Sequence, residues 1–240
     1  DWPERYVHDA FRVEIGAGMS ATLHREQSAL LRRLVDGEDL AISAPTSFGK
    51  SFVIDAFIEL TKPMNVVIIV PTLALTDETR RRLHRKFAPR YKVITTTNVE
   101  LSDRNLFIFP QERVQGYVDQ IANIDLLVID EFYKASLAFD KERAPALLSA
   151  ILRLQDRAKQ RYFLAPNISA LNESPFTQGM TFARLDFSSV YLEQHHLYVS
   201  INRDQVKRSR ALIEILLSQH GKTLIYAGSY SNIDRVGALT

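Results

Sequence analysis

Short segments rich in valine, isoleucine and leucine recur along the chain, and they constrain its fold more than any other feature. Residues 65–71 (NVVIIVP) and 125–130 (DLLVID) lack the alternation of polar and apolar residues that marks a half-exposed strand. Strands that are apolar on both faces are typical of parallel sheets covered by helices on both sides. Further strands are predicted at LAISA before residue 45, and at YKVITT, NLFIFP and RYFLAP, which begin at Tyr91, Asn105 and Arg161.

Between these strands, apolar residues recur at the three- and four-residue spacing of helices that bury one face. One predicted face contains Val53, Ile54, Phe57 and Ile58, and another contains Leu147, Leu148, Ile151 and Leu152. Alternation of buried strands with helices predicts an α/β fold, with a mostly parallel sheet flanked by helices.

The pattern weakens between about residues 172 and 199 and then restarts. A helix is predicted over about 203–219, with Gly221 as its stop, followed by the strand KTLIYAGS. We therefore predict a first α/β domain over 1–187, a connector over 188–202 and the start of a second, truncated domain over 203–240. The chain has no initiator methionine and ends within a helical pattern, so we expect it to be a fragment of a longer protein.

Composition narrows the classes of protein to consider. The chain has 240 residues, of which 46% are hydrophobic, and this is typical of a globular protein. Its net charge is only +2, so any surface that binds nucleic acid must be local. The absence of cysteine excludes disulfides and cysteine-ligated zinc, and it fits a reducing, cytoplasmic setting. No apolar run approaches the roughly 20 residues that span a bilayer, so no membrane association is expected.

The segment APTSFGKS matches the signature of a phosphate-binding loop between a strand and a helix, with alanine at the first glycine position. Small residues let backbone N–H groups surround a phosphate, and a helix that begins near Gly49 adds its positive dipole end. Lys50 is then placed to reach the β- and γ-phosphates of ATP, and the Ser51 hydroxyl to ligate Mg²⁺. The predicted nucleotide-binding residues here are Ala44, Pro45, Thr46, Ser47, Phe48, Gly49, Lys50 and Ser51.

Two adjacent carboxylates, Asp130 and Glu131, follow the apolar strand LLVI. Carboxylates at the end of a buried strand cost free energy unless something uses them. We expect Asp130 to hold Mg²⁺, through water, and Glu131 to orient or deprotonate the attacking water. The predicted catalytic residues are therefore Lys50, Asp130 and Glu131.

These segments together resemble superfamily-two helicases of the DExD/H-box kind, which are ATP-driven nucleic-acid motors. SAPTSFGKS is similar to motif I, IDEF to motif II, IVPTLALTDE to motif Ia, IFPQER to motif Ib and KTLIYAGSYSN to motif IV. The resemblance covers most of the chain and implies RecA-like domains, bound ATP and Mg²⁺, and DNA or RNA as a partner. It also implies that Gln27, in LHREQSALL, contacts the adenine edge, and that Thr72 and Arg113 contact the nucleic-acid backbone.

The chain departs from the family pattern at two motifs. FLAPNIS stands where motif III has S-A-T, and Phe109 stands where motif Ib has threonine. The arginine-bearing motifs V and VI would lie beyond Thr240. Because an arginine finger is worth about 10³–10⁵ in rate, we expect the fragment alone to hydrolyse ATP poorly. The D-E-F-Y box and SAPTSFGKS look most like helicase subunits of bacterial antiphage defence systems, which implies a partner protein in a defence complex.

A basic run follows motif Ia and consists of Arg80, Arg81, Arg82, Arg85, Lys86, Arg90 and Lys92. Contact with nucleic-acid phosphates is one interpretation, and a solvated helix face is the other. Phe132 and Tyr133 have the chemistry to stack on a base, although packing against the next helix is favoured. His195 and His196 are neighbours on an extended chain and point to opposite faces, so we expect no shared metal ion.

Three functions are compatible with these features. The leading one is an ATP-dependent helicase or translocase that acts on DNA or RNA. The second is a nucleotide-gated binding or scaffold subunit with little motor activity, which the altered motif III keeps open. The third is another phosphate-loop enzyme, such as a kinase or a transporter ATPase, against which Gln27 and the motif Ia and Ib segments argue.

Overall fold

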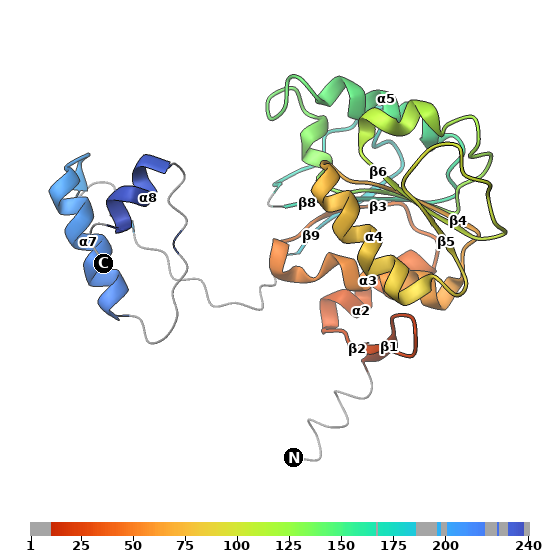
Figure 1. Ribbon diagram of the computed structural model, residues 1–240, viewed down its shortest axis with the longest axis horizontal. Helices are drawn as coiled ribbons and strands as arrows, with labels where there is room; N and C mark the ends of the chain where they lie inside the picture. Colours follow the sequence, from red (N-terminus) through yellow and green to blue (C-terminus); the bar gives the residue numbers. More distant parts are fainter. Residues whose placement is uncertain are drawn as a thin grey trace, which may run out of the picture. The chain divides into compact units, whose positions relative to one another are not determined.

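The computed structural model describes residues 11–166, 168–185, 196–197, 201–218, 225 and 230–237. The chain divides into two compact units, Asp1–Val190 and Tyr191–Thr240, and each is described by itself (Figure 1). The first unit contains β1 (Arg12–Glu14), β2 (Ser20–Thr22), α2 (Arg25–Val35), β3 (Leu40–Ser43), α3 (Lys50–Thr61), β4 (Asn65–Ile69), α4 (Leu73–Phe87), β5 (Lys92–Ile94), β6 (Asn105–Phe109), β7 (Leu126–Ile129), α5 (Ala144–Gln155), β8 (Arg161–Ala165) and β9 (Thr181–Arg184).

Seven strands form one sheet in the order β5-β6-β4-β7-β8-β3-β9, and every pairing in it is parallel. Successive residues of a strand belong to different cores. Val66 and Ile68 pack with α2, α3 and α4 on one face, whereas Val67 and Ile69 pack with α5 on the other. Both faces are thus covered, which is why these strands read as unbroken apolar runs. The predicted α/β fold with a mostly parallel sheet is confirmed.

All six predicted strands of the first domain are present, but the sheet also contains β9, which the sequence pattern did not reveal. β9 pairs with β3 in parallel, with Leu40 opposite Thr181. Its side chains are only half-buried or exposed, because it lies at the edge of the sheet. A four-residue edge strand needs no apolar run and therefore leaves little signal.

Two helices differ from their predicted faces. In α3, all six residues from Val53 to Ile58 are buried, so the predicted face is only part of a helix that is enclosed nearly all round. In α5, Leu147 and Ile151 are buried as predicted, but Leu152 is 49% exposed. Leu154 takes its place, since positions seven apart return to the same side of a helix whereas neighbouring positions lie about 100° apart.

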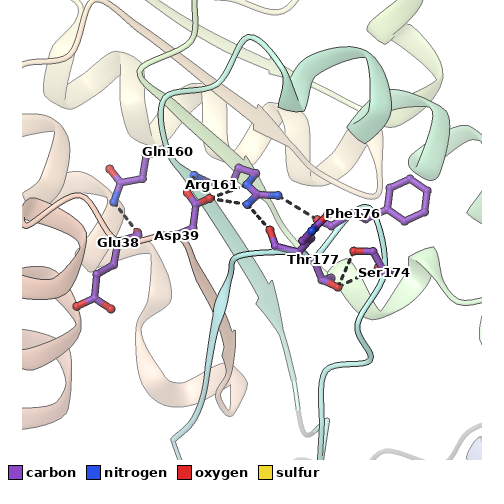
Figure 2. A network of polar contacts seen from close by, with 8 residues as sticks. Glu38, Asp39, Gln160, Arg161, Ser174, Phe176 and Thr177 are labelled. Carbon is purple, nitrogen blue, oxygen red and sulfur yellow. Dashed lines mark hydrogen bonds and ion pairs between the residues drawn. The ribbon is translucent and has the colours of Figure 1, made fainter.

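A polar network at the amino ends of β3, β8 and β9 holds the segment that leads into β9 (Figure 2). The guanidinium of Arg161 donates to Asp39 Oδ2 at 2.6 and 2.8 Å and to the Gln178 carbonyl at 2.8 Å. The Thr181 N–H donates to the Asp39 carbonyl at 2.8 Å. Gln160 Nε2 donates to the carbonyls of Leu34 and Glu38, both at 2.8 Å. These contacts, together with the backbone pairing of the two strands, hold β9 beside β3.

A half-buried carboxylate, Asp125, joins the starts of β4 and β7, and its removal should weaken the fold. Asp125 Oδ2 accepts the N–H groups of Met64 and Asn65 at 2.7 and 3.0 Å, and Oδ1 accepts Lys159 Nζ at 2.7 Å. Burial tends to raise the pKa of Asp125, but these donors outweigh it and hold the pKa below its ordinary value. We expect Asp125→Asn to lower the free energy of unfolding by about 1–2 kcal/mol at pH 7.

The stability effect of Asp125→Asn should depend on pH in a predictable direction. A carboxyl with a depressed native pKa stabilises the fold above its unfolded pKa of about 3.9, and this stabilisation is lost as the pH falls through the native pKa. The difference in the free energy of urea unfolding between wild type and Asp125→Asn should therefore be smaller at pH 3 than at pH 7. A difference in unfolding free energy of the same size at both pH values would show that the carboxylate charge does not stabilise the junction of β4 and β7.

The second unit contains α7 (Gln205–Ser218) and α8 (Tyr230–Gly237). α7 confirms the helix predicted over about 203–219. Gly221 and the predicted strand KTLIYAGS lie outside the described residues, apart from Ile225, and the domain boundaries at 187 and 202 stay predictions. Within the described part of the chain, no helix is both long and apolar enough to cross a membrane.

Candidate active site

The loop between β3 and α3 has the geometry of a phosphate cradle. It contains a 3₁₀ turn at Thr46–Phe48, and Gly49 then adopts a left-handed φ of 74° as the N-cap of α3. A Cβ atom at Gly49 would lie 2.8 Å from Gln27 Nε2 and 3.1 Å from the Phe52 ring, so only glycine fits here. α3 begins at Lys50, which places the free N–H groups of its first turn at the end of β3.

Lys50 lies between this loop and the acidic pair. Its Nζ donates to the carbonyls of Ala44 and Pro45 at 2.9 and 3.2 Å. Burial lowers the pKa of Lys50, and the nearby carboxylates of Asp130 and Glu131 oppose that shift. Lys50 and Asp130 line one cavity, and Glu131 directly follows Asp130, so the structure brings the lysine close to an acidic pair that begins 80 residues later in the sequence.

The acidic pair stands directly after β7. Burial raises the pKa of Asp130, the charge of Glu131 raises it further, and the cations of Lys50 and Arg82 oppose the shift. Glu131 has a left-handed φ of 54°, a conformation that costs a non-glycine residue about 1–3 kcal/mol and is typical of functional sites. Its carboxylate forms an ion pair with Lys134 at 2.5 Å. Sequence reasoning missed Lys134, although its i+3 spacing from Glu131 was a usable signal.

A cavity of about 210 Å³ opens at this point, lined by Thr46, Gly49, Lys50, Ser51, Arg82 and Asp130 among others. Whole-ligand pockets are commonly about 300–1,000 Å³, so this volume suits the phosphate end of a nucleotide. The ammonium of Lys50 and the guanidinium of Arg82 are positively charged donors that can bind phosphate oxygens. The Ser51 hydroxyl and the Asp130 carboxylate are the oxygen ligands that Mg²⁺ prefers. The residues present thus fit both ATP phosphates and Mg²⁺.

Gln27 lies beside the loop rather than apart from it. Its side chain is buried, Nε2 donates to the Phe48 carbonyl at 2.6 Å, and Oε1 accepts the His24 N–H at 3.1 Å as part of the cap of α2. Gln27 therefore supports the phosphate loop directly. The predicted contact with adenine stays a prediction, for which one N–H and one lone pair of the amide remain.

The two predicted nucleic-acid contacts lie at the carboxyl ends of neighbouring strands. Thr72 follows β4 as the exposed N-cap of α4, with its Oγ1 accepting the Leu75 N–H at 3.2 Å. Arg113 follows β6 and is exposed, and it donates to the Thr95 carbonyl at 3.4 Å. Arg113 also lines a cavity of about 330 Å³ together with Thr96 and Thr97. Both positions are thus open to a ligand on one edge of the sheet.

The basic run does not form a uniform surface for phosphates. Arg82 and Lys86 turn inward and pair with the fully buried Asp55 of α3. Arg80 and Arg81 pair with Asp77, Arg90 pairs with Glu59, and Lys92 donates to the Glu100 carbonyl. Arg82 and Lys86 therefore do not belong to an outward-facing surface for nucleic-acid phosphates, because helix packing directs them to a buried carboxylate.

Other predicted details have mixed outcomes. Phe132 packs on Phe163 of β8 with ring centroids 4.7 Å apart, and Tyr133 packs on Phe139 at 5.5 Å, so both rings have protein partners.

His196 is exposed, and His195 lies outside the described residues, as does Asn167 of the altered motif III. The neighbouring Ile168 N–H donates to Ser43 Oγ at 2.9 Å, which ties that motif to the end of β3. Sequence reasoning did not identify Ser43.

Comparison with known proteins agrees with this geometry. The model of the DEAD/DEAH box helicase family matches residues 24–165, which is more than half of the chain. The chain belongs to this family. It is 35% identical over 235 residues to Anti-bacteriophage protein B of Escherichia coli (strain K12), an alignment that covers 93% of this chain and 31% of that protein. The chain of this DEAD/DEAH box protein thus spans about a third of its relative's length.

Solved helicase structures share its fold. The DUF1998 helicase MrfA is 14% identical with a TM-score of 0.60, over 99% of this chain and 40% of that chain. MrfA bound to DNA and AMPPNP is 14% identical with a TM-score of 0.57, over 90% and 36%. The Hef helicase domain of Pyrococcus furiosus is 14% identical with a TM-score of 0.51, over 89% and 51%. These likenesses confirm the predicted RecA-like fold.

Proposed function

We propose that this protein is an ATP-dependent helicase or translocase, which hydrolyses ATP with Mg²⁺ to move along or remodel DNA or RNA. The observation that carries the proposal is that Lys50, Ser51 and Asp130 line one phosphate-sized cavity, with Glu131 directly after Asp130 in the chain. Membership of the DEAD/DEAH box helicase family supports the same activity.

Each side chain has a role that its position allows. Lys50 and the N–H groups at the start of α3 hold the β- and γ-phosphates. Ser51 and Asp130 would hold Mg²⁺, which when bound neutralises charge on the phosphates. Glu131, at the exit of β7, accepts a proton from the attacking water. Lys134 holds the Glu131 carboxylate in a defined position until substrate enters.

Nucleic acid would follow the edge of the sheet marked by Thr72 and Arg113. Thr72 stands at the N-terminus of a 15-residue helix, where free N–H groups and the helix dipole favour a phosphate. Arg113 offers an exposed guanidinium beside a cavity on the same edge. Backbone contacts of this kind bind without reading sequence, so they suit a motor that must move along its substrate.

The relative from Escherichia coli supports a proposal for the biological setting of this protein. Its name, Anti-bacteriophage protein B, supports a role for this protein in defence against phage. A partner protein in a defence complex, which the family resemblance implies, is part of the same proposal. A cytoplasmic location, as expected from the cysteine-free sequence, belongs to the same proposal.

The test is ATP hydrolysis by the complete gene product, with and without single-stranded DNA, duplex DNA and RNA. We expect one of these polymers to raise kcat, and the polymer that does so identifies the substrate. Lys50→Ala should abolish the activity, which shows that the measured rate belongs to this site.

Two other outcomes would contradict the proposal. ATP binding without turnover would favour a nucleotide-gated scaffold subunit, the function that the altered motif III leaves open. Turnover that depends on Lys50 but is indifferent to every polymer would favour another phosphate-loop enzyme, and a protein partner or a different phosphoryl acceptor would then be sought.

A further inference from the structure

A buried cluster of charges joins α3 to α4 beside the candidate nucleotide site. Asp55 of α3 is fully buried, and two cations one turn apart on α4 pair with its carboxylate. Lys86 Nζ lies 2.6 Å from Asp55 Oδ2, and Arg82 pairs with Oδ1. Two cations on one carboxylate leave a formal excess of one positive charge, and such an excess is costly in a buried position unless something compensates it.

The two cations have different surroundings. Arg82 Nη1 also donates to the Ser51 carbonyl at 3.3 Å, and Arg82 lines the 210 Å³ cavity with Lys50, Ser51 and Asp130. Its side chain is 22% exposed. Lys86 is 9% exposed, is absent from the cavity wall, and has its ammonium 5.5 Å from the centre of the Phe52 ring. The excess charge can therefore act on the cavity from Arg82 and not from Lys86.

The contact with Ser51 has a direct geometric consequence. Ser51 is the second residue of α3, so its carbonyl belongs to the helical turn whose N–H groups face the loop. A guanidinium that holds this carbonyl and Asp55 restrains that turn from the side of α4.

We propose that Arg82 is a positioning residue of the nucleotide site, which holds the first turn of α3 and adds the positive charge that favours nucleotide phosphates. This inference rests on the proposed function, because it assumes that the cavity binds ATP. It assigns to one member of the basic run a role that its neighbours on α4 do not share.

Arg82→Met and Lys86→Met form a matched pair for the test, since each leaves Asp55 paired with one remaining cation. Binding of Mg²⁺ and ATP is measured by titration calorimetry in the Glu131→Gln background of the complete protein, where hydrolysis does not interfere. Removing a charged donor near phosphates should weaken ATP binding about tenfold in Arg82→Met. Lys86→Met should weaken it less than about threefold, and Arg82→Lys should recover part of the loss.

Thermal unfolding without nucleotide separates this role from a merely structural one. Both methionine variants should lower Tm by similar amounts, because each removes one ion pair with Asp55. If they also weaken ATP binding equally, Arg82 acts only through the packing of the two helices and the proposal is overturned. If the Glu131→Gln protein with Arg82 intact binds no ATP, the proposed function itself fails, and that failure is recognised before any Arg82 variant is compared.

Discussion

Replacing Glu131 by glutamine should lower ATP hydrolysis by about 10²–10⁴-fold while ATP binding stays nearly unchanged. The reason is that different residues are proposed to bind the nucleotide and to take the proton. Lys50 and the start of α3 are proposed to hold the phosphates, whereas Glu131 follows Asp130 after β7, is absent from the cavity wall and pairs with Lys134. Glutamine keeps the size of the side chain and removes only its capacity to take a proton.

Single-turnover hydrolysis and calorimetric ATP binding, measured on the complete protein with its stimulating polymer, check this expectation. Glu142→Gln is the matched control, because Glu142 is an exposed glutamate in the loop before α5 and should retain the wild-type rate. A Glu131→Gln protein that keeps more than about a tenth of the wild-type rate would show that another group activates the water.

Replacing Asp55 by asparagine should lower the free energy of unfolding by about 3–5 kcal/mol. The variant leaves Arg82 and Lys86 close together on α4 without their counter-charge, where the contact of Lys86 is buried and that of Arg82 is partly buried. Because domains are typically stable by only about 5–15 kcal/mol, this loss should remove a large part of the total. Urea unfolding of the chain measures it.

Two further variants show whether the uncompensated charge of Arg82 and Lys86 causes the loss of stability in Asp55→Asn. Asp77→Asn removes a carboxylate that pairs with Arg80 and Arg81 at the surface, and it should change stability little. Adding Lys86→Met to Asp55→Asn removes one of the stranded cations and should restore part of the lost stability. If Asp55→Asn behaves like Asp77→Asn, the buried cluster contributes nothing beyond packing.

Several features that depend on local pattern could be predicted from the sequence alone. Apolar segments identified six strands of the parallel sheet, and in the central strands burial on both faces leaves no polar alternation. The phosphate loop was equally readable, because a left-handed Gly49 followed by a helix start is a short-range requirement. The strand-end position of Asp130 and Glu131 followed from the apolar run before them.

Features that depend on partners distant in the sequence were decided only by the tertiary structure. The basic residues of α4 looked alike in the sequence, yet Arg82 and Lys86 turn to Asp55, 27 and 31 residues earlier, because α3 and α4 pack on the same face of the sheet. β9 joins β3 through contacts of Asp39 and Arg161 rather than through an apolar pattern. Periodicity determines which elements form, but the partner of a buried charge depends on which elements the sheet order brings together.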